Sequence, residues 1–228
     1  MDFAITPPPQ AFVPVIDDDP FPVRRIYCVG RNYAAHAREM GHDPDREPPF
    51  FFMKPADALT EDGSVISYPP ATADLHHEIE LVVALDKGGA NIPEEKALEC
   101  VFGYTVGLDM TRRDLQSDAK ERGRPWDTGK GFDHSAPIGA LRSATSIGHP
   151  TNARISLSVN GANRQDGNIN QMIWNVPETI AYLSGLFELQ PGDIIFTGTP
   201  HGVAAVEPGD RLECTIEGIA KLTITYKS

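Results

Sequence analysis

Three acidic residues at two points of the chain have the spacing of a metal site. Glu78 and Glu80 lie in segment 77–85, where apolar residues alternate, so a strand would point both carboxylates to one face. Asp109 ends a second strand-like segment, 101–109. Like charges on one face of a half-buried strand repel each other unless a cation or hydrogen bonds offset them. Carboxylate oxygens suit Mg²⁺, Mn²⁺ or Ca²⁺ better than zinc, which predicts a divalent-metal site. The alternative is a solvated sheet face.

A histidine and a glutamate form a second candidate pair. His36 and Glu39 are three residues apart, and would therefore share one face of a predicted helix over 33–40. A carboxylate beside an imidazole orients it and raises its basicity, which suits a general base that activates water. An incidental pair on a surface helix is the alternative.

Cationic and polar residues in later loops could contact an anion. Lys130 stands between two glycines, which allow a ligand to approach the backbone closely. Arg113 and Gln116 would share a helix face within 111–122. Thr199 follows a strand-like run, and its hydroxyl and the neighbouring backbone N–H groups could hold an anion. The alternatives are a solvated lysine and a tight turn between strands.

The elements that must position these residues are both strands and helices. Segment 160–161, Asn-Gly, is a strong hairpin signal, and no regular strand–helix alternation or GxGxxG motif indicates a Rossmann fold. We therefore predict a mixed α+β fold with a large rolled or sandwiched sheet, and an irregular loop over 123–131. The predicted strands are 26–29, 50–53, 77–85, 101–109, 154–159, 194–197, 211–216 and a last one ending at 226. The predicted helices are 33–40, 93–100 and 177–187, and 111–122 is predicted to be helix or turn.

Length and charge restrict the class of protein. A chain of 228 residues suits one domain, which we place at 23–228 after a proline-rich extended arm, 1–22. Its 32 acidic and 20 basic residues give a net charge of −12, which argues against nonspecific binding of nucleic acid or of anionic membranes. The three cysteines lie in hydrophobic segments, as reduced core thiols do. No signal peptide or apolar membrane-length run is evident, so we expect a soluble cytoplasmic protein.

Taken together, these segments resemble the fumarylacetoacetate hydrolase family over roughly residues 24–226. The resemblance implies the mixed β-roll or sandwich of the fumarylacetoacetase C-terminal catalytic domain, and commonly a homodimer. The motifs that carry it are Gly30-Arg31-Asn32-Tyr33 with His36 and Glu39, His77-Glu78-Ile79-Glu80-Leu81, Gly103 to Asp109 with Arg113 and Gln116, Lys130-Gly131-Phe132-Asp133, and Gly198-Thr199-Pro200.

The resemblance also assigns roles to the candidate residues. It implies that the three carboxylates bind Mg²⁺ or Mn²⁺, and that His36 and Glu39 activate water from a lid helix. The implied substrate contacts are Arg113, Gln116, Lys130 and Thr199, of which Lys130 and Gln116 would stabilise an oxyanion. From their positions alone, Arg31, just ahead of the predicted lid, and Lys54, after the apolar run 50–53, are our candidates for contact with a distant carboxylate of the substrate.

One difference from the long members of the family indicates which subfamily the chain resembles. The long fumarylacetoacetases have a fourth metal carboxylate shortly before the catalytic histidine, whereas segment 27–35 has no Asp or Glu. Short members resemble acylpyruvate hydrolases, and segments 21–28, 40–44 and 54–57 are most similar to bacterial fumarylpyruvate hydrolases of gentisate catabolism. The expected reaction is metal-dependent hydrolysis of a carbon–carbon bond in a 2,4-diketo acid, giving fumarate and pyruvate from fumarylpyruvate. An oxaloacetate decarboxylase or a broader acylpyruvate hydrolase with the same site, and a noncatalytic binding protein, remain alternatives.

Overall fold

The largest element of the fold is an eight-stranded sheet. The computed structural model describes residues 3–33 and 47–228. Seven strands run in the order β4-β3-β15-β8-β9-β11-β5, and β12 pairs with β9 beside that path. The strands are β3 (Arg25–Gly30), β4 (Phe50–Lys54), β5 (Leu59–Glu61), β8 (Ile79–Leu85), β9 (Val101–Leu108), β11 (Ala136–Ile138), β12 (Arg142–Ser143) and β15 (Asp193–Phe196).

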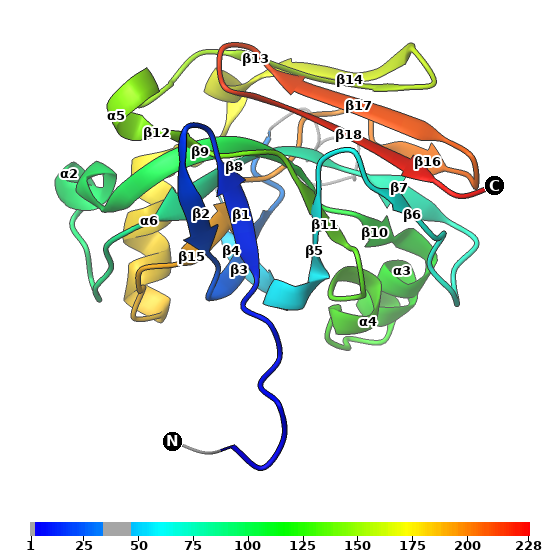
Figure 1. Ribbon diagram of the computed structural model, residues 1–228, viewed down its shortest axis with the longest axis horizontal. Helices are drawn as coiled ribbons and strands as arrows, with labels where there is room; N and C mark the ends of the chain where they lie inside the picture. Colours follow the sequence, from blue (N-terminus) through cyan, green and yellow to red (C-terminus); the bar gives the residue numbers. More distant parts are fainter. Residues whose placement is uncertain (1–2, 34–46) are drawn as a thin grey trace.

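A five-stranded sheet lies across one face of the large sheet (Figure 1). Its order is β14-β13-β17-β18-β6, and β13, β17 and β18 contact β8 or β9. Apolar side chains of both sheets, such as Leu81, Leu157 and Leu222, form a common core. Two sheets packed around one core confirm the predicted mixed α+β sandwich. The strands are β6 (Val65–Ile66), β13 (Arg154–Val159), β14 (Ala162–Asn168), β17 (Arg211–Ile216) and β18 (Ala220–Tyr226).

The alternation of β8 decides which side of the large sheet carries the carboxylates. Leu81 and Val83 face the core between the sheets, whereas Val82 and Ala84 belong to a second apolar cluster on the other face. Glu80 shares the face of Val82 because strand side chains alternate. Every residue of β8 is buried, so Glu80 does not lie on a solvated sheet face.

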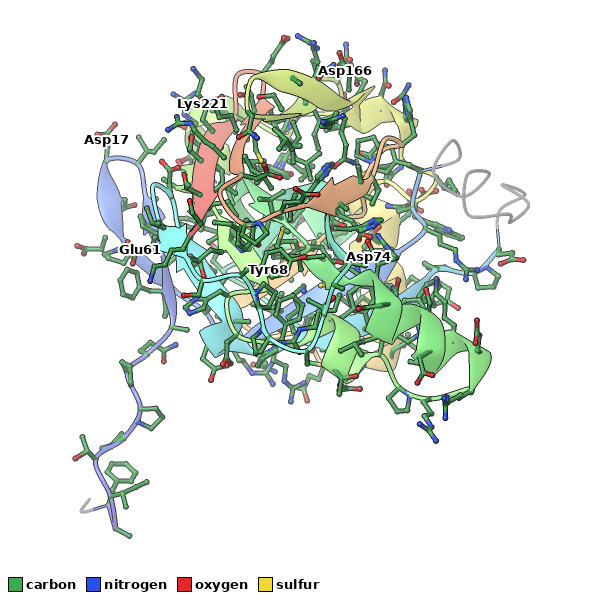
Figure 2. All side chains as sticks on the ribbon, turned by 90° about the vertical axis from the view of Figure 1, so that its right-hand side faces the viewer. Asp17, Glu61, Tyr68, Asp74, Asp166 and Lys221 are labelled. Atoms are coloured by element: carbon green, nitrogen blue, oxygen red, sulfur yellow. The ribbon has the colours of Figure 1, made fainter. Side chains whose placement is uncertain are left out.

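The second face is partly covered by a hairpin near the N-terminus. Strands β1 (Phe12–Val15) and β2 (Asp18–Pro22) pair antiparallel, and Val13 and Phe21 are buried in the second cluster. The sequence analysis placed this segment in an extended arm because of its prolines. A two-stranded ribbon tolerates proline, since many of its N–H groups have no ladder partner. The described chain before the hairpin, from residue 3, extends from the body (Figure 1), and Asp17 marks the hairpin tip in Figure 2.

Short helices surround the strands, and a three-stranded sheet joins β10 (Thr111–Arg112), β7 (Leu75–His77) and β16 (Ala204–Val206). The loop predicted over 123–131 contains helix α4 (Asp127–Lys130), so that prediction was incomplete. The predicted helix over 33–40 lies outside the described residues, and none of the described helices has the length and apolar composition of a membrane-crossing segment. The helices are η1 (Ala56–Ala58), α2 (Glu94–Ala97), η2 (Leu98–Cys100), α3 (Arg113–Glu121), α4 (Asp127–Lys130), α5 (Ala144–Ile147), η3 (Ile169–Gln171) and α6 (Val176–Leu186).

Candidate active site

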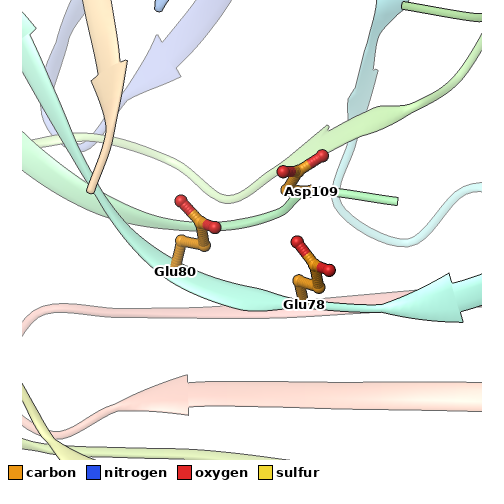
Figure 3. A group of neighbouring side chains, drawn as sticks. All are labelled: Glu78, Glu80 and Asp109. Carbon is orange, nitrogen blue, oxygen red and sulfur yellow. The ribbon is translucent and has the colours of Figure 1, made fainter. Parts of the chain in front are cut away.

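The pairing of β8 with β9 brings the three predicted carboxylates together. Glu80 is paired with Gly107, and one step beyond the ladder the N–H of Asp109 donates to the carbonyl of Glu78 at 2.9 Å. Figure 3 shows the three carboxylates turned toward one another, two from one stretch of chain and one from its neighbour. One oxygen of each lies within 4.8 Å of the others, and all three residues are buried.

Glu80 has the least compensated charge of the three. Among the described residues no lysine or arginine forms an ion pair with Glu80, in contrast to Glu78 and Asp109. Burial, followed by repulsion from Asp109 and Glu78, raises the pKa of Glu80 well above its ordinary value. The N–H of Gly198 donates to Glu80 Oε2 at 2.7 Å and opposes this rise. A cation placed among the carboxylates would keep Glu80 ionised.

The donor set fits a hard divalent cation. Carboxylate oxygens bind Mg²⁺ at about 2.0–2.1 Å and Ca²⁺ at about 2.3–2.6 Å, so two ligands of one ion lie up to about 5 Å apart. The 4.8 Å limit of the cluster is compatible with that span. Asp109 Oδ1 lies 2.9 Å from the ammonium of Lys54 but accepts no hydrogen bond, which leaves a lone pair available. These residues can therefore hold such an ion.

Lys130 lies beside the carboxylates rather than in solvent. Its ammonium donates to Glu78 Oε2 at 2.8 Å, to Asp109 Oδ2 at 2.6 Å and to Thr111 Oγ1 at 2.6 Å. Burial disfavours its charge, but attraction to Asp109 and Glu78 outweighs burial, so the pKa of Lys130 is raised. Lys130 is thus a protonated cation at the site, and the alternative of a solvated loop lysine is wrong.

Helix α3 supplies a guanidinium and an amide from one face. Arg113 forms an ion pair with Glu78 and donates to Gln116 Oε1 at 2.7 Å. This bond fixes the orientation of the Gln116 amide, whose nitrogen donates no hydrogen bond to any residue that the structure describes. The spacing of three residues, used to predict the pair, places both on the cavity wall.

The loop after β15 also contributes to the cavity wall. Gly198 has a left-handed φ of 94°, which directs its N–H toward Glu80, and Thr199 follows it on the cavity wall. Thr199 Oγ1 accepts from Gln165 Nε2 at 2.8 Å. Gln165 is fully buried and also accepts from the N–H of Ile79 at 3.1 Å, so it links this loop to the start of β8. Gln165 was not predicted, because the polar segment around it resembles an exposed hairpin strand.

The two cations predicted to bind a distant carboxylate of the substrate, Arg31 and Lys54, lie in different environments. Arg31 lines the cavity, with its guanidinium 5.3 Å from the ring centre of Phe50. The ammonium of Lys54 is instead buried next to Asp109 and donates to the carbonyls of Lys130 and Met110. Lys54 is not part of the cavity wall formed by the described residues.

These side chains line a partly open cavity of about 40 Å³. The proposed dyad of His36 and Glu39 lies outside the described residues. Lys120 was missed, although it follows Gln116 by one helical turn and the same spacing rule would have found it. The cavity wall consists of Val29, Gly30, Arg31, Phe50, Phe52, Glu78, Glu80, Asp109, Arg113, Gln116, Lys120, Trp126, Lys130 and Thr199.

The chain is similar in sequence and in structure to several known proteins. Residues 25–226 match the family "Fumarylacetoacetate (FAA) hydrolase C-terminal". The crystal structure of fumarylpyruvate hydrolase from Pseudomonas aeruginosa in complex with Mn²⁺ and pyruvate is 55% identical, with a TM-score of 0.96 over 99% of both chains. The fumarylpyruvate hydrolase of Ralstonia sp is 45% identical over 82% of this chain and 97% of its own. The mitochondrial oxaloacetate tautomerase FAHD1 of Mus musculus is 41% identical over 90% of this chain and 92% of its own.

Proposed function

Since the chain belongs to the fumarylacetoacetate hydrolase family, whose C-terminal domain it spans, we propose that it hydrolyses fumarylpyruvate to fumarate and pyruvate. The observation that carries this proposal is the cavity in which a buried carboxylate cluster meets Lys130, Arg113 and Gln116. Its close relative from Pseudomonas aeruginosa holds Mn²⁺ and pyruvate, which is the product expected here. Carbon–carbon bond hydrolysis agrees with the relatives' names.

Glu78, Glu80 and Asp109 hold Mg²⁺ or Mn²⁺ in this proposal, and Ca²⁺ is a third ion with the same preference for oxygen. When bound, the ion supplies a Lewis acid that polarises carbonyl oxygens and stabilises negative charge. It also offsets the repulsion that, after burial, raises the pKa of Glu80. The three carboxylates thereby become ligands whose ionised form is favoured at neutral pH.

The residues of the chain have separate tasks. His36, oriented by Glu39, takes a proton from the water that attacks the ketone distant from the pyruvyl group. The amide nitrogen of Gln116 donates to the oxygen that becomes negative as water adds, and the nearby positive charge of Lys130 stabilises that oxygen. Arg113 keeps that amide oriented. Breaking the carbon–carbon bond then releases fumarate and the enolate of pyruvate, which takes up a proton.

Chemistry on oxaloacetate is the second candidate, because a relative named for oxaloacetate tautomerisation is 41% identical over almost the same span. Decarboxylation or tautomerisation of oxaloacetate also produces enolate charge, but neither requires a hydrolytic water. A homodimer and a cytoplasmic location remain part of the proposal, on the basis of family resemblance alone.

The test is a product assay with one sample of enzyme and several substrates. Pyruvate release is measured with fumarylpyruvate and with acetylpyruvate, and oxaloacetate is followed both by CO₂ release and by the loss of its enol absorbance. Each assay is run with Mn²⁺ and with a chelator. Mn²⁺-dependent hydrolysis that is fastest with fumarylpyruvate supports the proposal, whereas faster turnover of oxaloacetate favours the second candidate. Activity that survives complete metal removal contradicts the metal-dependent reaction.

A further inference from the structure

The cations around the cavity fall into two groups. Arg113 and Lys130 form ion pairs with Glu78, and Lys130 also with Asp109, so both are committed to the carboxylate cluster. Arg31 and Lys120 line the same cavity, yet neither forms an ion pair or a side-chain hydrogen bond with any residue in the described parts of the chain. Among the described residues, 3–33 and 47–228, these two cavity-lining cations therefore have no anionic partner.

These two cations lie over a pair of touching aromatic rings. The ammonium of Lys120 is 5.1 Å from the ring centre of Trp126, and the guanidinium of Arg31 is 5.3 Å from that of Phe50. The two rings are in turn 5.4 Å apart in an edge-to-face contact. Cations are attracted to ring faces, so Trp126 and Phe50 hold both side chains at the cavity without neutralising them.

The backbone at Arg31 is also unusual. Its φ of 57° lies in the left-handed region, which an arginine adopts rarely. Gly30 precedes it, and a Cβ atom there would lie 2.0 Å from the Phe50 ring, so the close approach of that ring requires glycine. This turn places Arg31 at the cavity, and local strain of this kind often accompanies a functional role.

Lys120 is in an environment that would favour an anion. Partial burial, followed by repulsion from Arg113 and Arg31, lowers its pKa. A carboxylate between Lys120 and Arg31 would offset that repulsion and would gain charge-assisted hydrogen bonds. Lys120 also follows Gln116 by four residues on α3, so it lies one helical turn from the proposed oxyanion donor.

We propose that Lys120, together with Arg31, forms a carboxylate subsite that binds the second carboxylate of a dicarboxylic diketo acid, the one distant from the pyruvyl group. This inference rests on the proposed function. It assigns specificity to Lys120, a residue beyond the carboxylate cluster, and it replaces Lys54, whose ammonium is buried against Asp109. Phe50 and Trp126 would border the apolar part of the substrate between its two charged ends.

The test compares Lys120→Met with wild type on two substrates. Methionine keeps the length and apolar stem of lysine but removes the charge. We expect kcat/KM for fumarylpyruvate to fall about 10- to 100-fold, mainly through a higher KM, because a charge-assisted hydrogen bond is lost. Acetylpyruvate has a methyl group where fumarylpyruvate has the alkene and its terminal carboxylate. For this substrate we expect kcat/KM to change by less than about threefold. Lys120→Arg should restore most of the activity on fumarylpyruvate.

Lys221→Met is the matched control. Lys221 is exposed on β18, in the five-stranded sheet, and Figure 2 shows it on the opposite side of the molecule from α3. Its loss removes the same net charge without touching the cavity, so both substrates should be unaffected. Equal losses on fumarylpyruvate and acetylpyruvate in Lys120→Met, or no loss on either, would overturn the subsite.

A binding measurement separates this inference from the proposed function. Fumarate and pyruvate are titrated by calorimetry into Mn²⁺-loaded wild type and Lys120→Met, without turnover. The subsite predicts that fumarate binds at least about tenfold more weakly to the variant, whereas pyruvate binds equally. This result would support the subsite even if wild type hydrolysed no diketo acid, which would contradict the proposed function alone. Equal fumarate affinity in both proteins would reject the subsite.

Discussion

Lys130 and Asp109 are joined by a 2.6 Å hydrogen bond in the buried interior, and the same ammonium reaches Glu78 at 2.8 Å. One lysine is therefore shared by two of the three candidate metal ligands. The third, Glu80, accepts instead from the N–H of Gly198. The cluster thus contains an internal cation on one side and a neutral donor on the other, so its residues should respond differently to substitution.

Glu80→Gln should abolish turnover and weaken Mn²⁺ binding by more than about tenfold, because changes even to groups behind metal ligands typically cost 10- to 100-fold in affinity. The change removes a charge and a ligand oxygen while keeping the side-chain size. Calorimetric titration with Mn²⁺ measures the affinity, and Glu213→Gln, at an exposed position of β17, is the control. Normal Mn²⁺ content in Glu80→Gln would show that the metal lies elsewhere.

Lys54→Met should lower the free energy of unfolding by about 1–3 kcal/mol, because it removes one of the two cations beside buried Asp109 and the donor to two buried carbonyls, while Lys130 still pairs with Asp109. Urea denaturation of the metal-free protein checks this, with Lys221→Met as the surface control. If Lys54 contacts substrate instead, stability would be nearly unchanged and KM would rise. That outcome would instead support the role predicted from the sequence, in which Lys54 binds a distant carboxylate of the substrate.

Phe21→Ala should destabilise the protein by about 3 kcal/mol, since Phe21 is buried in the second cluster with its ring 5.1 Å from that of Phe102. Phe3 is 66% exposed, and Phe3→Ala should change stability by less than about 0.5 kcal/mol. Thermal or urea denaturation of both variants gives the comparison. Similar small effects would mean that the hairpin is only an attached arm.

Glu39→Gln should lower kcat by about 100-fold or more while Mn²⁺ affinity stays nearly constant, because the proposed dyad acts on water rather than on the ion. Single-turnover kinetics and the same calorimetric titration provide both values. Parallel losses in turnover and metal affinity would assign Glu39 a supporting role and place the base elsewhere.

Local patterns predicted much of the geometry of the candidate site and of the sheets. The alternation over 77–85 correctly placed Glu78 and Glu80 on one face, and the Asn160-Gly161 turn correctly predicted the hairpin of β13 and β14. Helical spacing brought Arg113 and Gln116 together. Each of these relationships depends on residues that are close in sequence, where strand and helix periods are sufficient.

Relationships between distant segments were not predictable in the same way. The burial of Lys54 under Asp109 depends on how β4 and β9 are placed in one sheet, and the contact of Gln165 with Thr199 joins strand β14 to the loop after β15. The hairpin containing Phe21 was missed because its proline content outweighed its few apolar residues. Tertiary pairing, which no short pattern encodes, decides all three.

The most direct measurement is kcat/KM for fumarylpyruvate, acetylpyruvate and oxaloacetate with one Mn²⁺-loaded preparation. Because a charge-assisted hydrogen bond contributes roughly 1.5–3 kcal/mol, we predict that kcat/KM for fumarylpyruvate exceeds that for acetylpyruvate by about 100-fold, and that oxaloacetate is turned over more slowly than fumarylpyruvate. Equal efficiency on the two diketo acids, or faster turnover of oxaloacetate than hydrolysis of either, would contradict the assignment as a fumarylpyruvate hydrolase.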